Sequence, residues 1–174
     1  SVALKFKKIS YLLSILINLN RLSTETVKQA LSVYSQQEGP MAKMLFVNLP
    51  CSNLTAAIEF YQALGFSQNM QFSDDTAACM VWSEHIFVML LTHAKWQSFT
   101  QRPIPDKGSS EVMLALSCDD KEAVDQVCNA AAKAGGTADI NAKQDLGFMY
   151  GRSVLDLDGH IWEFFWMDPA AVAG

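Results

Sequence analysis

The sequence predicts an α+β domain of two successive βαβββ modules, whose strands form a curved mixed sheet around a cleft, with a helical N-terminal extension. Two observations predict this class. After Met41 the chain shows a strand, a helix and three strands, and the same order returns in its second half. The two halves also align residue by residue at their first and last strands. In such a duplicated fold, one helix lies behind each sheet.

The composition is that of a folded protein without the features of nucleic-acid or membrane binding. Half of the 174 residues are hydrophobic and 18% are charged, which suffices for a substantial core. The formal net charge of −5 argues against a surface for nucleic acid or anionic membranes, so we expect neither partner. The four cysteines show no CxxC pair and no zinc spacing. We therefore expect reduced, buried thiols in a cytoplasmic protein.

Residues 1–40 differ in residue pattern from the rest of the chain. A basic segment followed by the apolar run 9–19 looks like a signal peptide, but the run is shorter than the roughly 20 residues that span a bilayer. No small-residue cleavage site follows it. We expect two short helices, about 4–20 and 24–37, the second capped by Ser23, in an extension that is native or an expression leader.

The first module is expected at about 43–92, within a domain that covers 41–174. Its helix begins at the N-cap candidate Asn53, carries one apolar stripe and ends at Gly65. Runs rich in β-branched, aromatic and other apolar residues surround the helix and are bounded by polar turns. The expected elements are a strand at 44–50, the helix at 53–66 and strands at about 67–73, 77–82 and 86–92.

The second module is expected at about 111–168. Its helix ends at Gly135-Gly136, and Asp158-Gly159 is a strong hairpin signal between the last two strands. The expected elements are a strand at 111–117, a helix at 121–134 and strands at about 137–144, 149–155 and 161–167. Between the modules, residues 93–110 contain two prolines and little periodicity, which predicts a linker or flap.

The internal repeat is also evident from direct alignment of the two halves. LFVNLPCSN (45–53) aligns with VMLALSCDD (112–120), and HIFVMLL (85–91) aligns with HIWEFFW (160–166). These alignments pair Phe46 with Met113 and Val88 with Glu163.

Two motifs resemble those of the vicinal oxygen chelate superfamily, which includes glyoxalase I, fosfomycin-resistance enzymes, extradiol dioxygenases and bleomycin-binding proteins. VNLPCSNLTAAIEFYQALGF (47–66) is similar to the family's first strand and its "FY…LGF" helix. YGRSVLDLDGHIWEFFW (150–166) is similar to its "D-x-D-G-x-x-x-E" ending. The resemblance covers roughly 43–168 and implies paired βαβββ modules and a homodimer. One scaffold of this kind hosts many chemistries, so it does not select a function.

Metal-dependent members of that family hold a divalent ion with His, Gln or Glu from the first and last strand of each module. The resemblance places these positions at Phe46, Val88, Met113 and Glu163. A Phe or Val side chain cannot coordinate, and a thioether is a poor ligand for hard divalent ions. We therefore expect no metal centre and no other cofactor, with Glu163 as the single protein carboxylate if a metal is present.

Glu163 is a lone carboxylate in an apolar strand. Strand alternation puts it on the face toward the cleft, while Trp162 and Phe164 face the helices. One interpretation makes Glu163 a general base or an anchor for a substrate amine or hydroxyl. The other makes it a carboxylate hydrogen-bonded to Arg152 or Tyr150, retained from a metal-binding relative.

The expected ligand site surrounds Glu163 and is mostly apolar, which suits a hydrophobic small molecule. Arg152 can bind a ligand carboxylate or phosphate, or it can pair with an acid such as Asp156. A closed core without a cavity is the alternative. The expected lining is Phe46, Asn48, Val88, Met113, Tyr150, Arg152 and Glu163, with Met89 or Leu90 added if a bulge shifts the register.

Two other groups of reactive residues are expected to be structural. Asp156, Asp158 and His160 look like metal ligands, but Asp158-Gly159 is hairpin chemistry. Cys51 and Cys118 occupy equivalent strand ends, which favours packing over nucleophilic catalysis.

Two functions follow from this pattern. The first is a metal-free protein that binds an apolar small molecule in the cleft. The second is a lyase or dioxygenase-type enzyme with Glu163 as general base or metal carboxylate.

Overall fold

The computed structural model describes residues 43–172. The helices expected at 4–20 and 24–37 lie outside these residues. Within the described part of the chain, no helix combines the length and the apolar character needed to cross a membrane.

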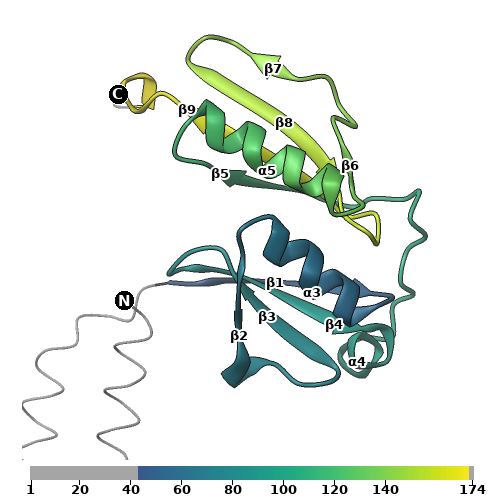
Figure 1. Cartoon of the computed structure of the whole chain (residues 1–174). Coiled ribbons are helices and arrows are strands. Elements are labelled where there is room, and N and C mark those ends of the chain that lie inside the picture. The colour runs from purple at the N-terminus through teal and green to yellow at the C-terminus, as the bar shows by residue number, and fades with distance from the viewer. Residues whose placement is uncertain (1–42, 173–174) are drawn as a thin grey trace, which may run out of the picture. The chain divides into compact units, whose positions relative to one another are not determined.

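The first module forms a four-stranded mixed sheet with a helix on one face (Figure 1). The strand order is β1-β4-β3-β2; β1 pairs parallel with β4, and the other neighbours are antiparallel. Its elements are β1 (Leu45–Cys51), α3 (Leu54–Ala63), β2 (Ser67–Asn69), the 3₁₀ turn η1 (Met70–Phe72), β3 (Ala77–Val81) and β4 (Ile86–Thr92). A short helix, α4 (His93–Phe99), follows β4 directly.

The second module repeats this topology. Its sheet has the order β5-β9-β8-β6, with β5 parallel to β9, and β7 adds to β8. Its elements are β5 (Met113–Ser117), α5 (Lys121–Lys133), β6 (Thr137–Ala138), β7 (Gln144–Asp145), β8 (Met149–Leu155), β9 (Ile161–Met167) and α6 (Pro169–Val172). The predicted α+β fold of paired βαβββ modules is confirmed.

The helix boundaries follow from the predicted local signals. Asn53 accepts a hydrogen bond from the Ala56 N–H at 3.1 Å, which caps the first turn of α3. Asp120 does the same for α5 through the Ala123 N–H at 2.7 Å. Gly65 follows the end of α3 with a φ of 100°, a left-handed conformation that glycine adopts without strain.

Three expected elements differ from the observed ones. The strand predicted at 67–73 ends at Asn69, whose side chain accepts from the Gln71 N–H and turns the chain into η1. The strand predicted at 137–144 is interrupted at Asp139, which has a φ of 57°. The predicted flap at 93–110 begins with α4, capped by the Thr92 hydroxyl oxygen.

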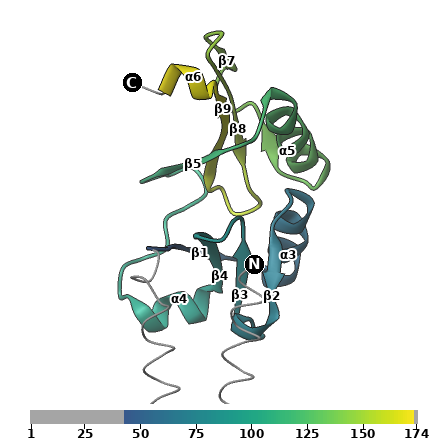
Figure 2. The same ribbon diagram turned by 90° about the vertical axis from the view of Figure 1, so that its left-hand side faces the viewer.

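The two modules share one core. α3 and α5 pack beside each other on the same side of their sheets (Figures 1 and 2). Tyr61 of α3 is fully buried and donates to Asp156 at 2.8 Å, while the Trp162 indole donates to the Tyr61 hydroxyl at 2.9 Å. These bonds satisfy the polar atoms of two large buried rings. Burial of the rings therefore stabilises the contact between the two modules without leaving an unpaired donor.

Candidate functional site

The last strand separates a buried face from an open one. Trp162 and Phe164 of β9 are 1% and 0% exposed and belong to the core beneath α5. Glu163 lies between them in sequence and points to the opposite face, where it is half-buried. The predicted alternation of β9 is therefore confirmed.

A pocket of about 260 Å³ surrounds Glu163 on the open face of the second sheet. The carboxylate has small neighbours, since Ala115 of β5 and Ser153 of β8 stand directly beside it in the sheet register. The pocket wall combines apolar and amide side chains. Its lining residues are Asn141, Ala142, Gln144, Met149, Gly151, Arg152, Ser153, Glu163, Phe164, Phe165 and Met167.

Within residues 43–172, the Glu163 carboxylate makes no hydrogen bond or ion pair. The nearest hydroxyl in the register, that of Ser153, accepts from the Asn141 N–H at 2.8 Å and donates to the Asn141 carbonyl at 3.5 Å. The interpretation that Arg152 or Tyr150 satisfies Glu163 is therefore wrong.

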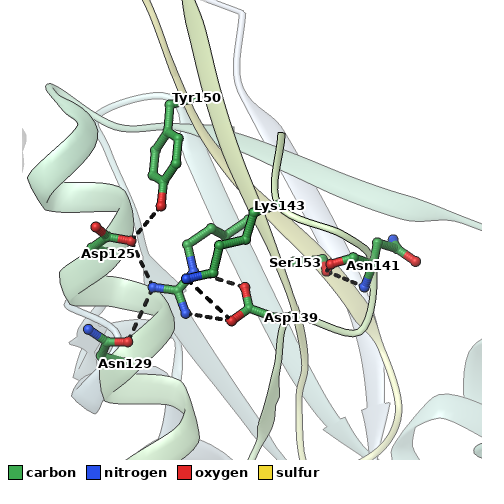
Figure 3. A network of polar contacts seen from close by, with 8 residues as sticks. Asp125, Asn129, Asp139, Asn141, Lys143, Tyr150 and Ser153 are labelled. Atoms are coloured by element: carbon green, nitrogen blue, oxygen red, sulfur yellow. Dashed lines mark hydrogen bonds and ion pairs between the residues drawn. The ribbon is translucent and has the colours of Figure 1, made fainter. Parts of the chain in front are cut away.

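Tyr150 instead belongs to a polar network on the α5 side of the sheet (Figure 3), and Arg152 joins that network through its bond to Asp125 of α5. The guanidinium group of Arg152 donates two bonds to Asp139, at 2.9 and 2.8 Å, and one to Asp125 at 2.8 Å. The Tyr150 hydroxyl donates to Asp125 at 2.8 Å. Both side chains were expected in the ligand site; their polar groups are directed to α5 and to Asp139, and Arg152 does not pair with Asp156.

This network shifts the pKa values of its members. The hydrogen bonds from Arg152 lower the pKa of Asp139, and the Tyr150 hydroxyl followed by Arg152 lowers that of Asp125. The same bonds raise the pKa of Arg152 above its ordinary value. Arg152 is 6% exposed and fully paired, so it has the properties of a structural cation and not of a free anion receptor.

Val88 does not lie in the predicted site. It is 0% exposed and packs in the core beneath α3. Asn48 aligns with Ala115 in the repeat, and Asn48 pairs with Met89 whereas Ala115 pairs with Glu163. The counterpart of Glu163 is therefore Met89 and not Val88. Because neighbouring residues of a strand point to opposite faces, this difference of one residue puts Val88 in the core and Met89 on the open face.

The remaining predicted residues lie on the open faces of the two sheets. Phe46 is 47% exposed and stacks on Phe87 with ring centroids 4.6 Å apart. Met113 is 56% exposed on the edge strand β5. Asn48 is exposed and lines a second pocket. The predicted residues that line pockets are thus divided between two pockets, one in each module.

The second pocket has a volume of about 490 Å³ and lies where α4 approaches β1 and β4. It is lined by Asn48, Leu91, Trp96, Phe99 and Thr100. The Trp96 indole nitrogen is buried and has no hydrogen-bond partner among residues 43–172. Trp96 and Phe99 were not among the residues predicted for the site, although a Thr followed by a short polar-aromatic segment after β4 signals a capped helix.

The side chains at the four positions that the family resemblance assigns to metal ligands do not fit a divalent metal. Glu163 supplies the single carboxylate, while Phe46, Met113 and Met89, which replaces Val88 as the counterpart of Glu163, offer a ring and two thioethers. Among residues 43–172, no group of three or more His, Cys, Asp or Glu side chains gathers in a metal-binding arrangement. One carboxylate among soft and apolar side chains is not a coordination sphere for a hard ion.

The other reactive residues have structural roles. Asp156 accepts from the backbone N–H groups of Asp158 and His160 and so fixes the turn between β8 and β9, as predicted. All four cysteines are free thiols. Burial, with Asp158 and Asp156 nearby, raises the pKa of Cys51 to about 12, which keeps it a protonated and weak nucleophile at neutral pH.

Comparison with known proteins identifies the fold and the family to which the site belongs. The sequence model of the Glyoxalase/Bleomycin resistance protein/Dioxygenase superfamily matches residues 43–164. No match is found among proteins with curated descriptions. Similar solved structures include a hypothetical protein from S. aureus, with 29% sequence identity, a TM-score of 0.61, and coverage of 77% of this chain and 98% of that one.

Two further structures share the fold at lower identity. A glyoxalase/bleomycin resistance protein/dioxygenase family enzyme from Burkholderia phytofirmans PsJN is 20% identical, with a TM-score of 0.60 and coverage of 72% and 99% of the two chains. TnmS3, an antibiotic binding protein from Streptomyces sp. CB03234, is 15% identical, with a TM-score of 0.52 and coverage of 75% and 99%.

Proposed function

Because the chain belongs to the Glyoxalase/Bleomycin resistance protein/Dioxygenase superfamily, we propose that it binds a largely apolar small molecule without a metal centre. Both binding proteins and enzymes occur on this fold, so the choice depends on the site. The residue types at the four implied ligand positions support binding, since Phe46, Met113 and Met89 supply no hard ligand in addition to Glu163.

The observation that carries this proposal is the pocket beneath α4. Its volume of about 490 Å³ falls within the range of roughly 300–1,000 Å³ that is usual for small-molecule sites. Leu91, Trp96 and Phe99 supply apolar surface, and Asn48 and Thr100 supply polar groups. An apolar wall with few polar groups is the usual composition of a site for a hydrophobic ligand. The antibiotic-binding protein TnmS3 gives a precedent for this use of the fold.

The assembly and location belong to the same proposal. We place the protein in the cytoplasm as a homodimer, a proposal supported by its four free thiols and by the apolar residues of its edge strands. Leu45, Phe46, Val112 and Met113 at the starts of β1 and β5 are each about half-exposed. Light scattering tests this: Phe46→Lys should give a monomer, and a wild-type monomer would contradict the proposal.

The binding proposal is tested with Nile red, a neutral apolar dye whose fluorescence rises in apolar sites. We expect saturable binding of one dye per chain. Phe99→Ser should weaken it by about tenfold, because the variant removes an aromatic wall worth over 1 kcal/mol. Met70→Ser is the matched control, since Met70 is equally exposed but lies outside the pocket. Equal effects of the two variants would contradict the proposal.

An enzyme that uses Glu163 as a general base is the second candidate. The unpaired carboxylate in its own pocket favours it, because a general base needs a free lone pair beside bound substrate. Glu163→Gln separates the candidates. If it abolishes a turnover while binding is retained, the protein is an enzyme; if no turnover depends on Glu163, this candidate fails.

A further inference from the structure

The pocket in the second module contains one carboxylate, that of Glu163, which forms no ion pair with any of the described residues. Glu163 stands on the central strand pair of the sheet, half-buried and without a partner within residues 43–172. The other carboxylates near this part of the sheet are engaged, since Asp139 bonds Arg152 and Asp145 bonds Lys121 at 2.9 Å. The unpaired charge is therefore specific to Glu163.

Three cations of the module, Arg152, Lys143 and Lys121, are also engaged by carboxylates. The guanidinium of Arg152 is held by Asp139 and Asp125 on the α5 side of the sheet (Figure 3). Lys143 pairs with Asp139 at 3.8 Å, and Lys121 pairs with Asp145. None of these groups neutralises Glu163, so a bound molecule that covers the carboxylate has to supply the compensating donor itself.

The walls of the pocket define the rest of that molecule. Phe165 follows Glu163 on the same face of β9, and Met149 and Met167 form a directly opposed pair at the far end of the pocket. An aromatic ring and two thioethers beside one carboxylate match a cationic nitrogen attached to an apolar body. The pocket volume of about 260 Å³ suits a group of that kind and not a large polar ligand.

We propose that the Glu163 pocket, which shares no lining residue with the pocket beneath α4, takes a molecule whose protonated amine pairs with Glu163 and whose apolar body lies against Phe165, Met149 and Met167. This inference rests on the proposed small-molecule-binding function and names the chemical class that the Glu163 pocket takes. A neutral molecule of the same shape leaves the carboxylate desolvated and unpaired, so it binds more weakly.

The experiment compares two probes of equal size by titration calorimetry at neutral pH: 2-naphthylmethylamine, which is protonated, and neutral 2-naphthylmethanol. In the wild-type chain the amine should bind about tenfold more tightly than the alcohol, the preference expected for one partly desolvated ion pair. Glu163→Gln should remove this preference and leave alcohol binding unchanged. Glu84→Gln, at an exposed turn of the first module, is the matched control and should retain it.

A second variant keeps the test independent of any defect in Glu163→Gln. Ala115 is exposed and stands directly beside Glu163 in the register, so Ala115→Lys places an ammonium group next to the carboxylate. It should remove the amine preference as Glu163→Gln does. Equal affinity of both probes in the wild type, or an amine preference that survives both variants, would overturn the inference and leave the proposed binding function standing.

Two outcomes of the same binding experiments would also bear on the proposed function and on metal binding by Glu163. If neither probe binds and Nile red does not bind, the proposed function fails together with this inference. If Mn²⁺, Zn²⁺ or Ni²⁺ binds at one ion per chain and Glu163→Gln abolishes that binding, Glu163 is a metal ligand and the amine proposal is overturned.

Discussion

Ser153 and Glu163 face each other across β8 and β9, yet the Ser153 hydroxyl is bonded to Asn141 and leaves the carboxylate unpaired. One residue before Ser153, Arg152 points to the other face of the sheet and binds Asp139 and Asp125. Strand β8 thus has an ionic network on one face and, on the other, the neighbouring carboxylate of Glu163, which has no partner among residues 43–172. We expect the network to contribute to stability, and the proposed ligand site lies on the other face.

Arg152→Lys should lower the free energy of unfolding and leave ligand binding unchanged. A lysine cannot donate the forked pair of bonds to Asp139 and also reach Asp125, so we expect a loss of about 1–3 kcal/mol in urea unfolding. Lys121→Ala is the control, because its exposed pair with Asp145 is worth about 0–1 kcal/mol. Weakened Nile red binding by Arg152→Lys would show that the guanidinium acts in the site after all.

The same network predicts loss of stability in acid. The folded pKa values of Asp139 and Asp125 lie below their ordinary values, so their contribution is complete above the unfolded pKa, about 3.9, and is lost as pH falls through the folded values. Urea unfolding should show constant stability near neutrality and a decline below about pH 4. Asp139→Asn should reduce that decline, and an unchanged decline would exclude the network as its source.

Gly136→Ala should destabilise the joint between the modules. A Cβ at Gly136 would lie 2.6 Å from the Leu155 carbonyl oxygen and 2.7 Å from the Phe60 ring, closer than packed atoms allow. We expect a loss of about 1–3 kcal/mol in thermal or urea unfolding. At Gly151 the nearest atom would be 3.6 Å away, so Gly151→Ala should change stability by less than about 0.5 kcal/mol. Similar losses in both variants would contradict the close approach.

Trp96 and Trp162 should respond oppositely to replacement by phenylalanine. Within the described part of the chain the buried Trp96 indole nitrogen has no partner, so Trp96→Phe removes a desolvated donor and should raise stability by about 1 kcal/mol. The Trp162 indole donates to Tyr61, and Trp162→Phe should cost about 2–3 kcal/mol in the same urea experiment. A comparable loss in both variants would show that the Trp96 donor is satisfied in solution.

The fold was predictable because its signals are local and occur twice. Asn53 and Asp120 cap their helices, Gly65 and Gly135 follow the helix ends, and the alternation in β9 separates its buried face from its open face. The helix α4 was not predicted because its seven residues make only about two turns, too few to show a helical repeat of apolar residues.

The site was only partly predictable because its contacts are distant in sequence. Arg152 meets Asp125 and Asp139 across 27 and 13 positions, and neither pairing has a sequence signal. Val88 was misplaced because the repeat was aligned on His85 and His160, whereas the strand register matches Glu163 with Met89. A shift of one residue in a strand exchanges the core for the open face.

The most direct test of metal-free ligand binding is the equilibrium binding of Nile red to the full chain before and after treatment with EDTA. The account predicts saturable binding of one dye per chain with an affinity that EDTA does not change, because the residues that line the pocket beneath α4 include no carboxylate, imidazole or thiol. Loss of binding after EDTA, with recovery on addition of Zn²⁺, Mn²⁺ or Ni²⁺, would contradict it.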